Sequence, residues 1–389
     1  MRRSPAQRLR FTHIYLENWK NFRRVDVGLQ ERVFLVGPNA SGKSNFLDVF
    51  RFLRDIVSIG GGFQQAVQDR YGVSRLRCLA ARSSSDIVIQ VRLGSDEEPA
   101  AWRYLLRFSQ DAAGRPGIVE ETVARSGKTI LGRPDDNDKS DPERLTQTYL
   151  EQVYANQDFR EVGEFFKSVH YLHIVPQLVR EPDRSVGIQN DPYGGDFLEQ
   201  IAKTPQRRRR CRLGQILKAL RAAVPQLNEL ELARDDRGTP HLMGKYEHWR
   251  PRGAWQIEDQ FSDGTLRLMG LLWSILEGAG PVLLEEPELS LHPELVRLIP
   301  QVFARLQRRS GRQVLLSTHS ADLLTDEGIG LDEVLLLTPS QEGTEVRAAG
   351  EFQEIRALLE GGSSMAEAVI PRTRPPKLHQ LAFAFGDKD

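Results

Sequence analysis

The stretch Gly37-Pro38-Asn39-Ala40-Ser41-Gly42-Lys43-Ser44 decides which fold this sequence predicts. It follows an apolar run at 33–36 and precedes the helix-like segment 45–50. The pattern is that of a phosphate-binding loop, in which glycines let backbone N–H groups face a phosphate chain at a helix N-terminus. Lys43 would contact the β- and γ-phosphates, and the Ser44 hydroxyl would be a ligand of Mg²⁺. We therefore expect an ATP site at Gly37, Pro38, Asn39, Ala40, Ser41, Gly42, Lys43, Ser44 and Asn45.

The composition is that of an ordinary globular protein. With 389 residues, 40% hydrophobic and 27% charged, the chain can bury a large core in one elaborated domain or two. The formal net charge is zero, so any attraction to nucleic acid must come from a local patch. The two cysteines, Cys78 and Cys211, lie far apart without metal-like spacing. We expect a reducing cytoplasm, no targeting segment and no membrane span.

Periodicity divides the chain into a β-rich first part, a mixed middle and an α/β last third. The first part predicts strands and then an antiparallel meander, at 10–18, 24–29, 86–93, 101–108 and 117–125. Residues 132–142 predict a polar surface loop, residues 142–168 a helix, and residues 213–223 an amphipathic helix. The last third predicts helices at 266–277 and 293–308 between strands at 281–285, 313–317, 333–337 and 344–348. We expect the phosphate-loop strand to share one sheet with this last third.

A second motif ends the apolar strand Pro281-Val282-Leu283-Leu284 with two acids, Glu285 and Glu286. This is the Walker B arrangement, by which a phosphate-loop enzyme holds Mg²⁺ and orients a water molecule. Successive strand residues point to opposite faces, so adjacent acids can have different tasks. We expect Glu285 to serve the metal and Glu286 to polarise the attacking water.

Further stretches resemble the ABC-type ATPases, and within them the RecF/SMC-like ATPases of prokaryotes. Phe261-Ser262-Asp263-Gly264-Thr265 resembles the ABC signature loop, and Glu286-Pro287-Glu288-Leu289-Ser290-Leu291-His292-Pro293 resembles the D-loop region. Leu315-Leu316-Ser317-Thr318-His319-Ser320 ends with a histidine at the switch position. The opening Leu16-Glu17-Asn18-Trp19-Lys20-Asn21-Phe22 is also typical of this branch. The resemblance covers nearly the whole chain, with the middle matched in layout only.

The resemblance implies roles for several residues. Ser262, Asp263 and Gly264 would close on the nucleotide of a partner subunit, so that a homodimer forms across ATP. His319 would contact the γ-phosphate, and Gln177 would take the Q-loop place and join Ser44 and Glu285 as a ligand of Mg²⁺. Two departures stand out, because Glu285 replaces the usual aspartate and the long coiled-coil arm of SMC proteins has no counterpart.

The fold that follows is α/β, an ABC-ATPase-type P-loop NTPase with a mixed β-sheet core, an antiparallel β subdomain and an inserted helical lobe. We expect four parts. Residues 1–175 form ATPase lobe I, residues 176–260 an inserted and mostly helical lobe, residues 261–345 ATPase lobe II, and residues 346–389 a C-terminal helix and tail.

The sharpest charge asymmetry lies at 201–225, which contains eight basic residues and no acid. Such a run binds phosphate backbone without reading sequence, but it also serves as a protein-docking surface or a solvated helix face. All three readings stay open. The candidates are Arg207, Arg208, Arg209, Arg210 and Arg212.

The motifs together predict an ATP-hydrolysing, Mg²⁺-dependent homodimer that acts in DNA repair or anti-phage defence, with DNA as one candidate partner. The alternative is a regulatory scaffold that controls a nuclease or toxin encoded by a neighbouring gene. This chain shows no nuclease-like acid cluster of its own. A transporter motor fits poorly, because the opening is RecF-like and the sequence predicts no membrane segment.

Overall fold

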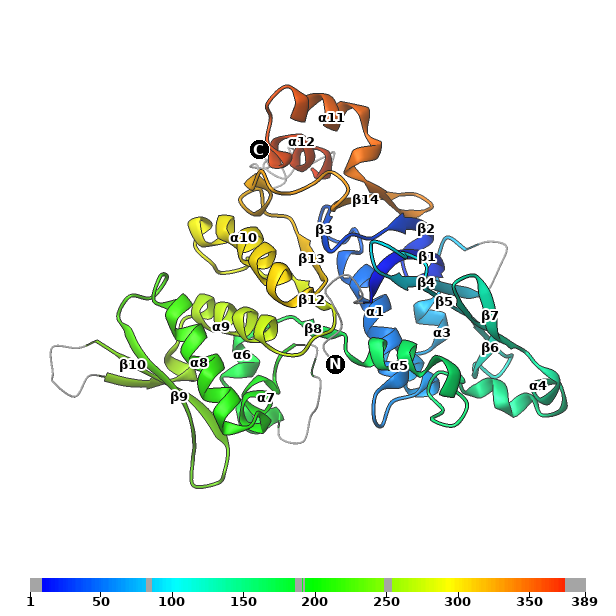
Figure 1. Cartoon of the computed structure of the whole chain (residues 1–389), viewed down its shortest axis with the longest axis horizontal. Helices are drawn as coiled ribbons and strands as arrows, with labels where there is room; N and C mark the ends of the chain where they lie inside the picture. The colour runs from blue at the N-terminus through cyan, green and yellow to red at the C-terminus, as the bar shows by residue number, and fades with distance from the viewer. Residues whose placement is uncertain (1–8, 82–85, 186–190, 192, 248–253, 375–389) are drawn as a thin grey trace, which may run out of the picture.

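The computed structural model describes residues 9–81, 86–185, 191, 193–247 and 254–374. Three sheets organise these residues, with the phosphate loop beside the central one (Figure 1). The predicted tail beyond residue 374 lies outside the described residues. None of the helices in the described part of the chain is both long enough and apolar enough to cross a membrane.

The central sheet has six strands, and β3 lies inside it between β13 and β14. All neighbouring pairs are parallel except β14 with β15. This order joins the phosphate-loop strand to the last third of the chain, which confirms the predicted shared sheet. From edge to edge the strands are β15 (Gly343–Ala348), β14 (Val334–Ser340), β3 (Arg32–Val36), β13 (Val314–Thr318), β12 (Val282–Glu285) and β8 (His170–Leu172).

A second six-stranded sheet is antiparallel throughout. The predicted meander is confirmed, and β2 forms one edge of this sheet while β7 extends the other. From edge to edge the strands are β2 (Phe22–Gly28), β1 (Arg10–Trp19), β4 (Ile87–Gly94), β5 (Trp102–Gln110), β6 (Pro116–Arg125) and β7 (Lys128–Arg133).

Alternate residues of the central strands feed two different cores, as the period of a β-strand requires. Leu35 and Leu315 join a core with the antiparallel sheet and the aromatic side chains of α1, where the rings of Phe11 and Phe50 lie 4.6 Å apart. Phe34 and Val36, on either side of Leu35 in β3, face the opposite core. The first core contains α1 (Lys43–Val57), α2 (Phe63–Gln68), α3 (Val73–Leu76) and α5 (Arg160–Lys167), and the second contains α9 (Asp263–Leu276), α10 (Pro293–Ser310), α11 (Gln353–Glu360) and α12 (Met365–Val369).

The inserted segment packs a third core against α9 (Figure 1). It contains helices, as predicted, but also a three-stranded antiparallel sheet that the sequence reading missed. The predicted helix at 213–223 begins earlier, directly after Pro205, and ends at Leu220. The elements are α6 (Pro176–Val179), α7 (Phe197–Lys203), α8 (Gln206–Leu220), β9 (Leu227–Arg234), β10 (Pro240–Tyr246) and β11 (Ala254–Ile257).

The predicted surface loop at 132–142 and helix at 142–168 are wrong. Residues 132–142 carry the end of β7 and the short helix α4 (Asp136–Ser140), which a capping box from Asp135 begins. Of residues 142–168, only short 3₁₀ turns and α5 are helical. The aspartates at 135–138 looked like a solvated loop because sequence periodicity cannot show that a buried arginine pairs with one of them.

That arginine is Arg133, whose side chain is fully buried together with Asp138 and Glu121. It donates to Asp138 from Nε at 2.9 Å and from Nη2 at 2.8 Å, and to Glu121 from Nη1 at 3.1 Å. Two backbone carbonyl oxygens, of Gln147 and Arg144, accept its remaining N–H groups. All five donors of the guanidinium are therefore satisfied.

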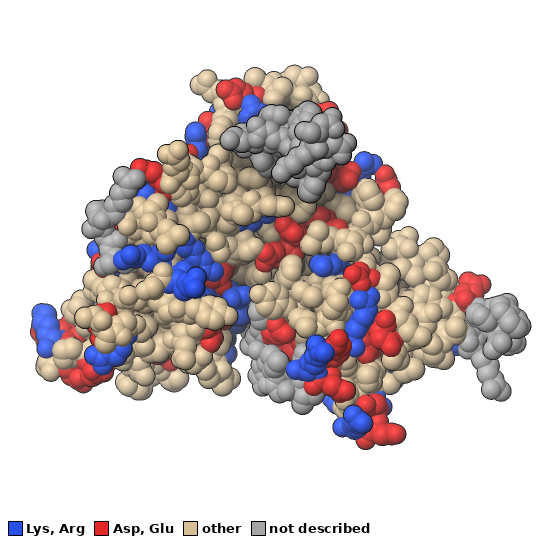
Figure 2. Space-filling view, turned by 180° about the vertical axis from the view of Figure 1, so that it is seen from behind, with Lys and Arg blue, Asp and Glu red and all other residues tan. Residues whose placement is uncertain are grey.

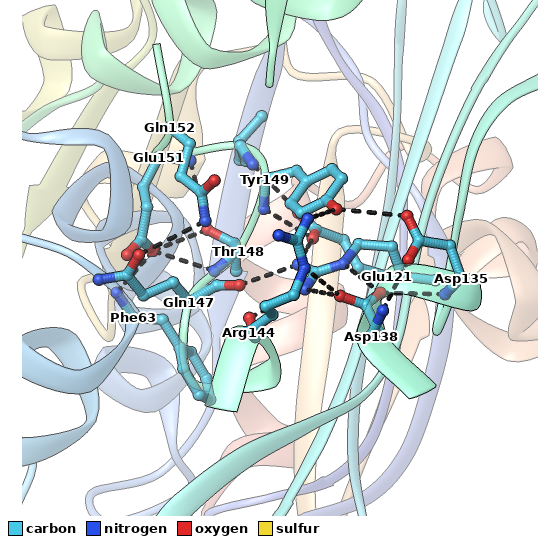
Figure 3. A network of polar contacts seen from close by, with 12 residues as sticks. Phe63, Glu121, Asp135, Asp138, Arg144, Gln147, Thr148, Tyr149, Glu151 and Gln152 are labelled. Atoms are coloured by element: carbon cyan, nitrogen blue, oxygen red, sulfur yellow. Dashed lines mark hydrogen bonds and ion pairs between the residues drawn. The ribbon is translucent and has the colours of Figure 1, made fainter. Parts of the chain in front are cut away.

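Neighbouring side chains extend this network (Figure 3). Tyr149 lies under the guanidinium of Arg133 with 3.8 Å between the charge and the ring centroid, and its hydroxyl donates to Asp135 at 3.3 Å. Hydrogen bonds from Arg133 lower the pKa of Asp138 to about 2, so this carboxylate is charged at neutral pH. The network fixes 134–151 against the far end of the antiparallel sheet.

We predict that Arg133→Met destabilises the protein by about 3–5 kcal/mol, because it leaves two buried carboxylates without their cation. Urea unfolding followed by circular dichroism measures this. Arg103→Met, on the exposed face of β5, is the matched control and should stay within about 0.5 kcal/mol of wild type. A loss below about 1 kcal/mol for Arg133→Met would contradict a structural role for the network.

Candidate nucleotide-binding site

The phosphate loop connects β3 to α1, and its backbone requires glycine at one position. Gly42, the residue before α1, has φ 96°, and a Cβ atom there would lie 2.0 Å from Asn21 Nδ2. Ala40 also has a positive φ, of 61°. These turns direct the chain into the N-terminus of α1, where free N–H groups favour an anion.

Asn21 is the residue that holds the loop in this shape, a role that was not predicted from the sequence. Its Nδ2 donates to the Ser41 carbonyl oxygen at 2.9 Å and to Thr344 Oγ1 at 2.8 Å, while its Oδ1 accepts from Asn45 at 2.8 Å. Trp19 Nε1 in turn donates to the Asn45 carbonyl oxygen at 2.9 Å. The turn between β1 and β2 therefore holds the phosphate loop from outside. The only sequence signal for this role was that Asn21 belongs to the opening motif that resembles the RecF-like branch.

Lys43 is buried at the start of α1. Its Nζ donates to the carbonyl oxygens of Gly37 at 2.9 Å and Pro38 at 3.1 Å. Burial lowers the pKa of this amine, and the three nearby glutamates, Glu286, Glu288 and Glu285, oppose that shift. A buried cation of this kind is the group that a phosphate chain would pair with.

Ser44 and Glu285 come together although 241 residues separate them. Ser44 Oγ donates to one carboxylate oxygen of Glu285, and the Tyr171 hydroxyl donates to the other. A hydroxyl beside a carboxylate is the oxygen donor set that Mg²⁺ prefers, so these two residues fit the predicted metal site. Tyr171 was not predicted. It reaches Glu285 because β8 lies next to β12, which only the sheet order reveals.

Glu286 turns away from Glu285 through a strained backbone, with φ 43°. Its N–H donates to the carbonyl oxygen of Ser317 at 3.1 Å, which fixes the turn. Its Oε1 lies 3.2 Å from His319 Nδ1, and both side chains are partly exposed. The structure therefore brings the predicted water-polarising acid and the predicted switch histidine into direct contact.

A third acid of this region, Glu288, was quoted in the D-loop but given no role. It is buried, and its Oε1 accepts from Thr318 Oγ1 at 2.5 Å. Thr318 Oγ1 also accepts from the backbone N–H of Ser320 at 3.0 Å. Burial raises the pKa of Glu288. Glu288 thus ties the D-loop to the loop that carries His319.

The signature residues lie at the start of α9. Ser262 is the N-cap, and its Oγ accepts from the Thr265 N–H at 3.2 Å. Asp263 pairs with Arg180 at 2.6 Å. A Cβ atom on Gly264 would lie 2.4 Å from the Ser290 carbonyl oxygen, so the signature loop packs directly on the D-loop.

Two predicted groups are not joined to the phosphate loop. Among the described residues, no hydrogen bond or ion pair links 262–264 to 37–45. Gln177 is exposed on α6, and no described hydrogen bond connects it to Ser44 or Glu285. Its place beside the metal stays a prediction.

A cavity of about 1030 Å³ opens beside the phosphate loop at Asn21 and Asn45. Its wall includes Lys20, Arg51 and Tyr71, and the inserted segment contributes Tyr193. This is the size of a large small-molecule pocket, roughly 300–1,000 Å³. Asn45, in the first turn of α1, is the residue that its wall shares with the predicted ATP site.

The basic run lies on α7 and α8, away from the phosphate loop. On the face drawn in Figure 2, lysine and arginine side chains form several small groups interspersed with acids. Arg209 donates to the Ala202 carbonyl oxygen at 3.1 Å, whereas Arg207, Arg208 and Arg210 are exposed. The two cysteines do not pair, since Cys78 is buried and Cys211 exposed, each as a free thiol.

Comparison with known proteins identifies the family. Residues 32–326 match the model of the family described as "AAA domain, putative AbiEii toxin, Type IV TA system". The chain belongs to this AAA ATPase family. No curated protein matches it significantly.

Solved structures of SMC head domains have the same fold as this AAA ATPase. An SmcHead bound to the C-winged helix domain of ScpA has a TM-score of 0.53 at 11% identity, over 87% of this chain and 97% of that one. A Pyrococcus furiosus Smc head with an extended coiled coil, bound to the C-terminal domain of ScpA, has a TM-score of 0.51 at 10% identity, over 92% and 100%. A Pyrococcus yayanosii Smc head with a coiled coil and joint gives 0.50 at 10%, over 92% and 100%. The chain is therefore a RecF/SMC-like P-loop ATPase with the ABC-type fold.

We predict that Gly42→Ala lowers ATP affinity at least about 100-fold. The added methyl group would clash with Asn21, and the φ of 96° at this position is strained for any residue that has a Cβ atom. Titration with a fluorescent ATP analogue measures it. Gly114→Ala is the matched control, since Gly114 has φ 80° and nothing within 4 Å of the new Cβ atom. An affinity of Gly42→Ala within about threefold of the control would refute this role of Asn21.

Proposed function

We propose that this AAA ATPase binds Mg²⁺-ATP, hydrolyses it, and dimerises around it. The observation that supports this most is the meeting of three strand ends, which brings Lys43, Glu286 and His319 to one edge of the central sheet. In open sheets of this kind, ligands bind at the carboxyl ends of the parallel strands.

Each residue has a task in this proposal. The loop N–H groups and Lys43 hold the β- and γ-phosphates, and Ser44 with Glu285 holds Mg²⁺, which would neutralise charge that develops on the phosphates. Glu286 accepts a proton from the attacking water, and His319, 3.2 Å away, orients that carboxylate and contacts the γ-phosphate. Tyr171 and Ser44 fix both oxygens of Glu285, which compensates for the longer side chain at a position where aspartate is usual.

A second copy of the chain would complete the site. Gly264 packs against the D-loop, and neither Ser262 nor Gly264 has a described link to its own phosphate loop. In the proposed dimer they meet the γ-phosphate held by the other subunit, with the N-terminus of α9 aimed at the anion.

We divide the chain in this proposal into four parts, which are lobe I at 1–175, an insertion at 176–260, lobe II at 261–345 and a C-terminal part at 346–389.

The pathway that we propose is DNA repair or anti-phage defence. The family's description, with its toxin and type IV toxin–antitoxin system, favours the defence side. The same words support the alternative, a regulatory ATPase that controls a separately encoded nuclease or toxin. SMC heads bound to domains of ScpA give a precedent for a partner protein on this fold.

We predict that Glu286→Gln retains ATP binding and loses turnover by about 10²–10⁴-fold, because an amide fits the same space but cannot accept the proton of water. Phosphate release at saturating Mg²⁺-ATP measures the rate, and equilibrium binding measures the affinity. Glu294→Gln, on the exposed first turn of α10, is the control and should turn over normally. Normal turnover in Glu286→Gln would assign the proton acceptor elsewhere.

A further inference from the structure

Helix α8 divides the basic run into two faces. Arg208 and Arg212, four residues apart, lie one above the other on the helix and line one cavity. Arg207 and Arg210 line a different cavity, beside Cys211. The run is therefore not one continuous patch, and the two faces can be tested against each other.

The cavity under Arg208 and Arg212 lies where the inserted segment meets the central sheet and has a volume of about 370 Å³. The α7–α8 connection, the start of β8 and the end of α9 form its wall. Its volume falls in the range of small-ligand pockets, roughly 300–1,000 Å³. The lining residues are His170, Gln200, Lys203, Thr204, Pro205, Arg208, Arg212 and Glu277.

Charge in this cavity is unbalanced. Three cations, Lys203, Arg208 and Arg212, face one carboxylate, Glu277, which leaves two positive charges. Glu277 lies 3.5 Å from Arg212. Lys203 and Arg208 have no ion pair with any acid in the described part of the chain.

Behind the wall, Arg312 adds a further positive charge. Its side chain is buried and bonds four backbone carbonyl oxygens, but its Nη2 has no partner among the described residues. Burial lowers the pKa of Arg312 to about 10; the nearby Glu277 carboxylate opposes this shift, and Arg212 adds to it. A further anion near this buried guanidinium would favour its charged form, as Glu277 already does.

His170, the first residue of β8, supplies an unused polar atom. Its Nε2 is buried and has no hydrogen-bond partner in the described structure. Burial, together with Arg312 and Arg54, lowers the pKa of His170 to about 3, so the imidazole is neutral. An unsatisfied buried polar atom costs about 1–3 kcal/mol, and with its proton on Nε2 the neutral imidazole could donate to a ligand oxygen and remove that cost.

Helix α8 also begins at this cavity. Pro205 is its N-cap and provides no side-chain cap, so the first N–H groups of this 15-residue helix are free to bind an anion. Thr204 and Pro205 both line the cavity, which places that helix end at its rim. Cationic side chains, a free helix N-terminus and an unpaired imidazole nitrogen thus meet in one place.

We propose that this cavity binds a phosphate monoester, carried by a free small molecule or by the end of a nucleic-acid strand. Two net positive charges match a group that carries about −1.5 to −2 at neutral pH. Arg208 and Arg212 suit its oxygens because a guanidinium binds phosphate through paired N–H groups. The inference is independent of ATP hydrolysis, since the cavity shares no residue with the phosphate loop.

The test measures phosphate binding in a Lys43→Ala background, which removes the contribution of the phosphate loop. The probes are a short single-stranded DNA with a 5′-phosphate, the same strand with a 5′-hydroxyl, and inorganic phosphate. We expect Arg208→Ala and Lys203→Ala each to weaken binding of phosphate-bearing probes by about tenfold, the loss of one charge-assisted hydrogen bond. Arg207→Ala removes the same charge from the neighbouring residue and should change binding by less than about twofold.

The probes separate the two sources of phosphate. A loss in Arg208→Ala that is confined to the 5′-phosphorylated strand assigns the cavity to a nucleic-acid end. The same loss for inorganic phosphate, with both strands bound alike, assigns it to a small phosphorylated molecule. Equal losses in Arg207→Ala and Arg208→Ala, or no loss in Arg208→Ala with any probe, would overturn the proposal. Melting temperatures check folding, since Arg207 and Arg208 are both exposed.

Discussion

The parallel pairing of β3 with β13 is the constraint on which the candidate site depends. Val36 lies opposite Thr318, so the phosphate loop begins beside the loop that carries His319. β12 pairs in register on the other side of β13, with Glu285 opposite Ser317, and this places the Walker B acids at the same edge. Because alternate residues of these strands fill two separate cores, a shift of one residue would reverse every buried side chain and separate the three strand ends.

Polar clamps then convert this arrangement of strands into a defined site. Asn21 fixes the loop through Ser41, and Tyr171 fixes Glu285 from the neighbouring strand. Glu286 has a positive φ, as does Ser290 in the D-loop, so strained backbone is concentrated where the proposed chemistry takes place. The contact of Gly264 with Ser290 joins the signature loop to the D-loop, and Glu288 joins the D-loop to the switch loop. The signature loop, the D-loop and the loop that carries His319 are therefore joined to one another by direct contacts.

The sequence predicted what local patterns encode. The motifs that contain Lys43, Glu285 and His319 could be assigned to the ends of strands, because each motif follows an apolar run in the sequence. Tyr171 and Asn21 could not, since their partners are set by sheet order and by the turn between β1 and β2. The strands at 227–257 were missed because they form a small sheet with partly exposed faces and weak alternation. The buried Arg133 network was read as a loop, because composition counts charges without showing which of them pair.

The central claim is that each ATP site uses residues from two subunits, and mixing two inactive variants tests it most directly. Ser262→Arg keeps an intact phosphate loop but blocks the signature loop, whereas Lys43→Ala does the reverse. The account predicts that each variant alone is inactive and that an equal mixture recovers up to about a quarter of the wild-type ATPase rate, because half of randomly formed dimers contain one complete site. A mixture that stays as inactive as its components, while both variants fold, would contradict a shared site.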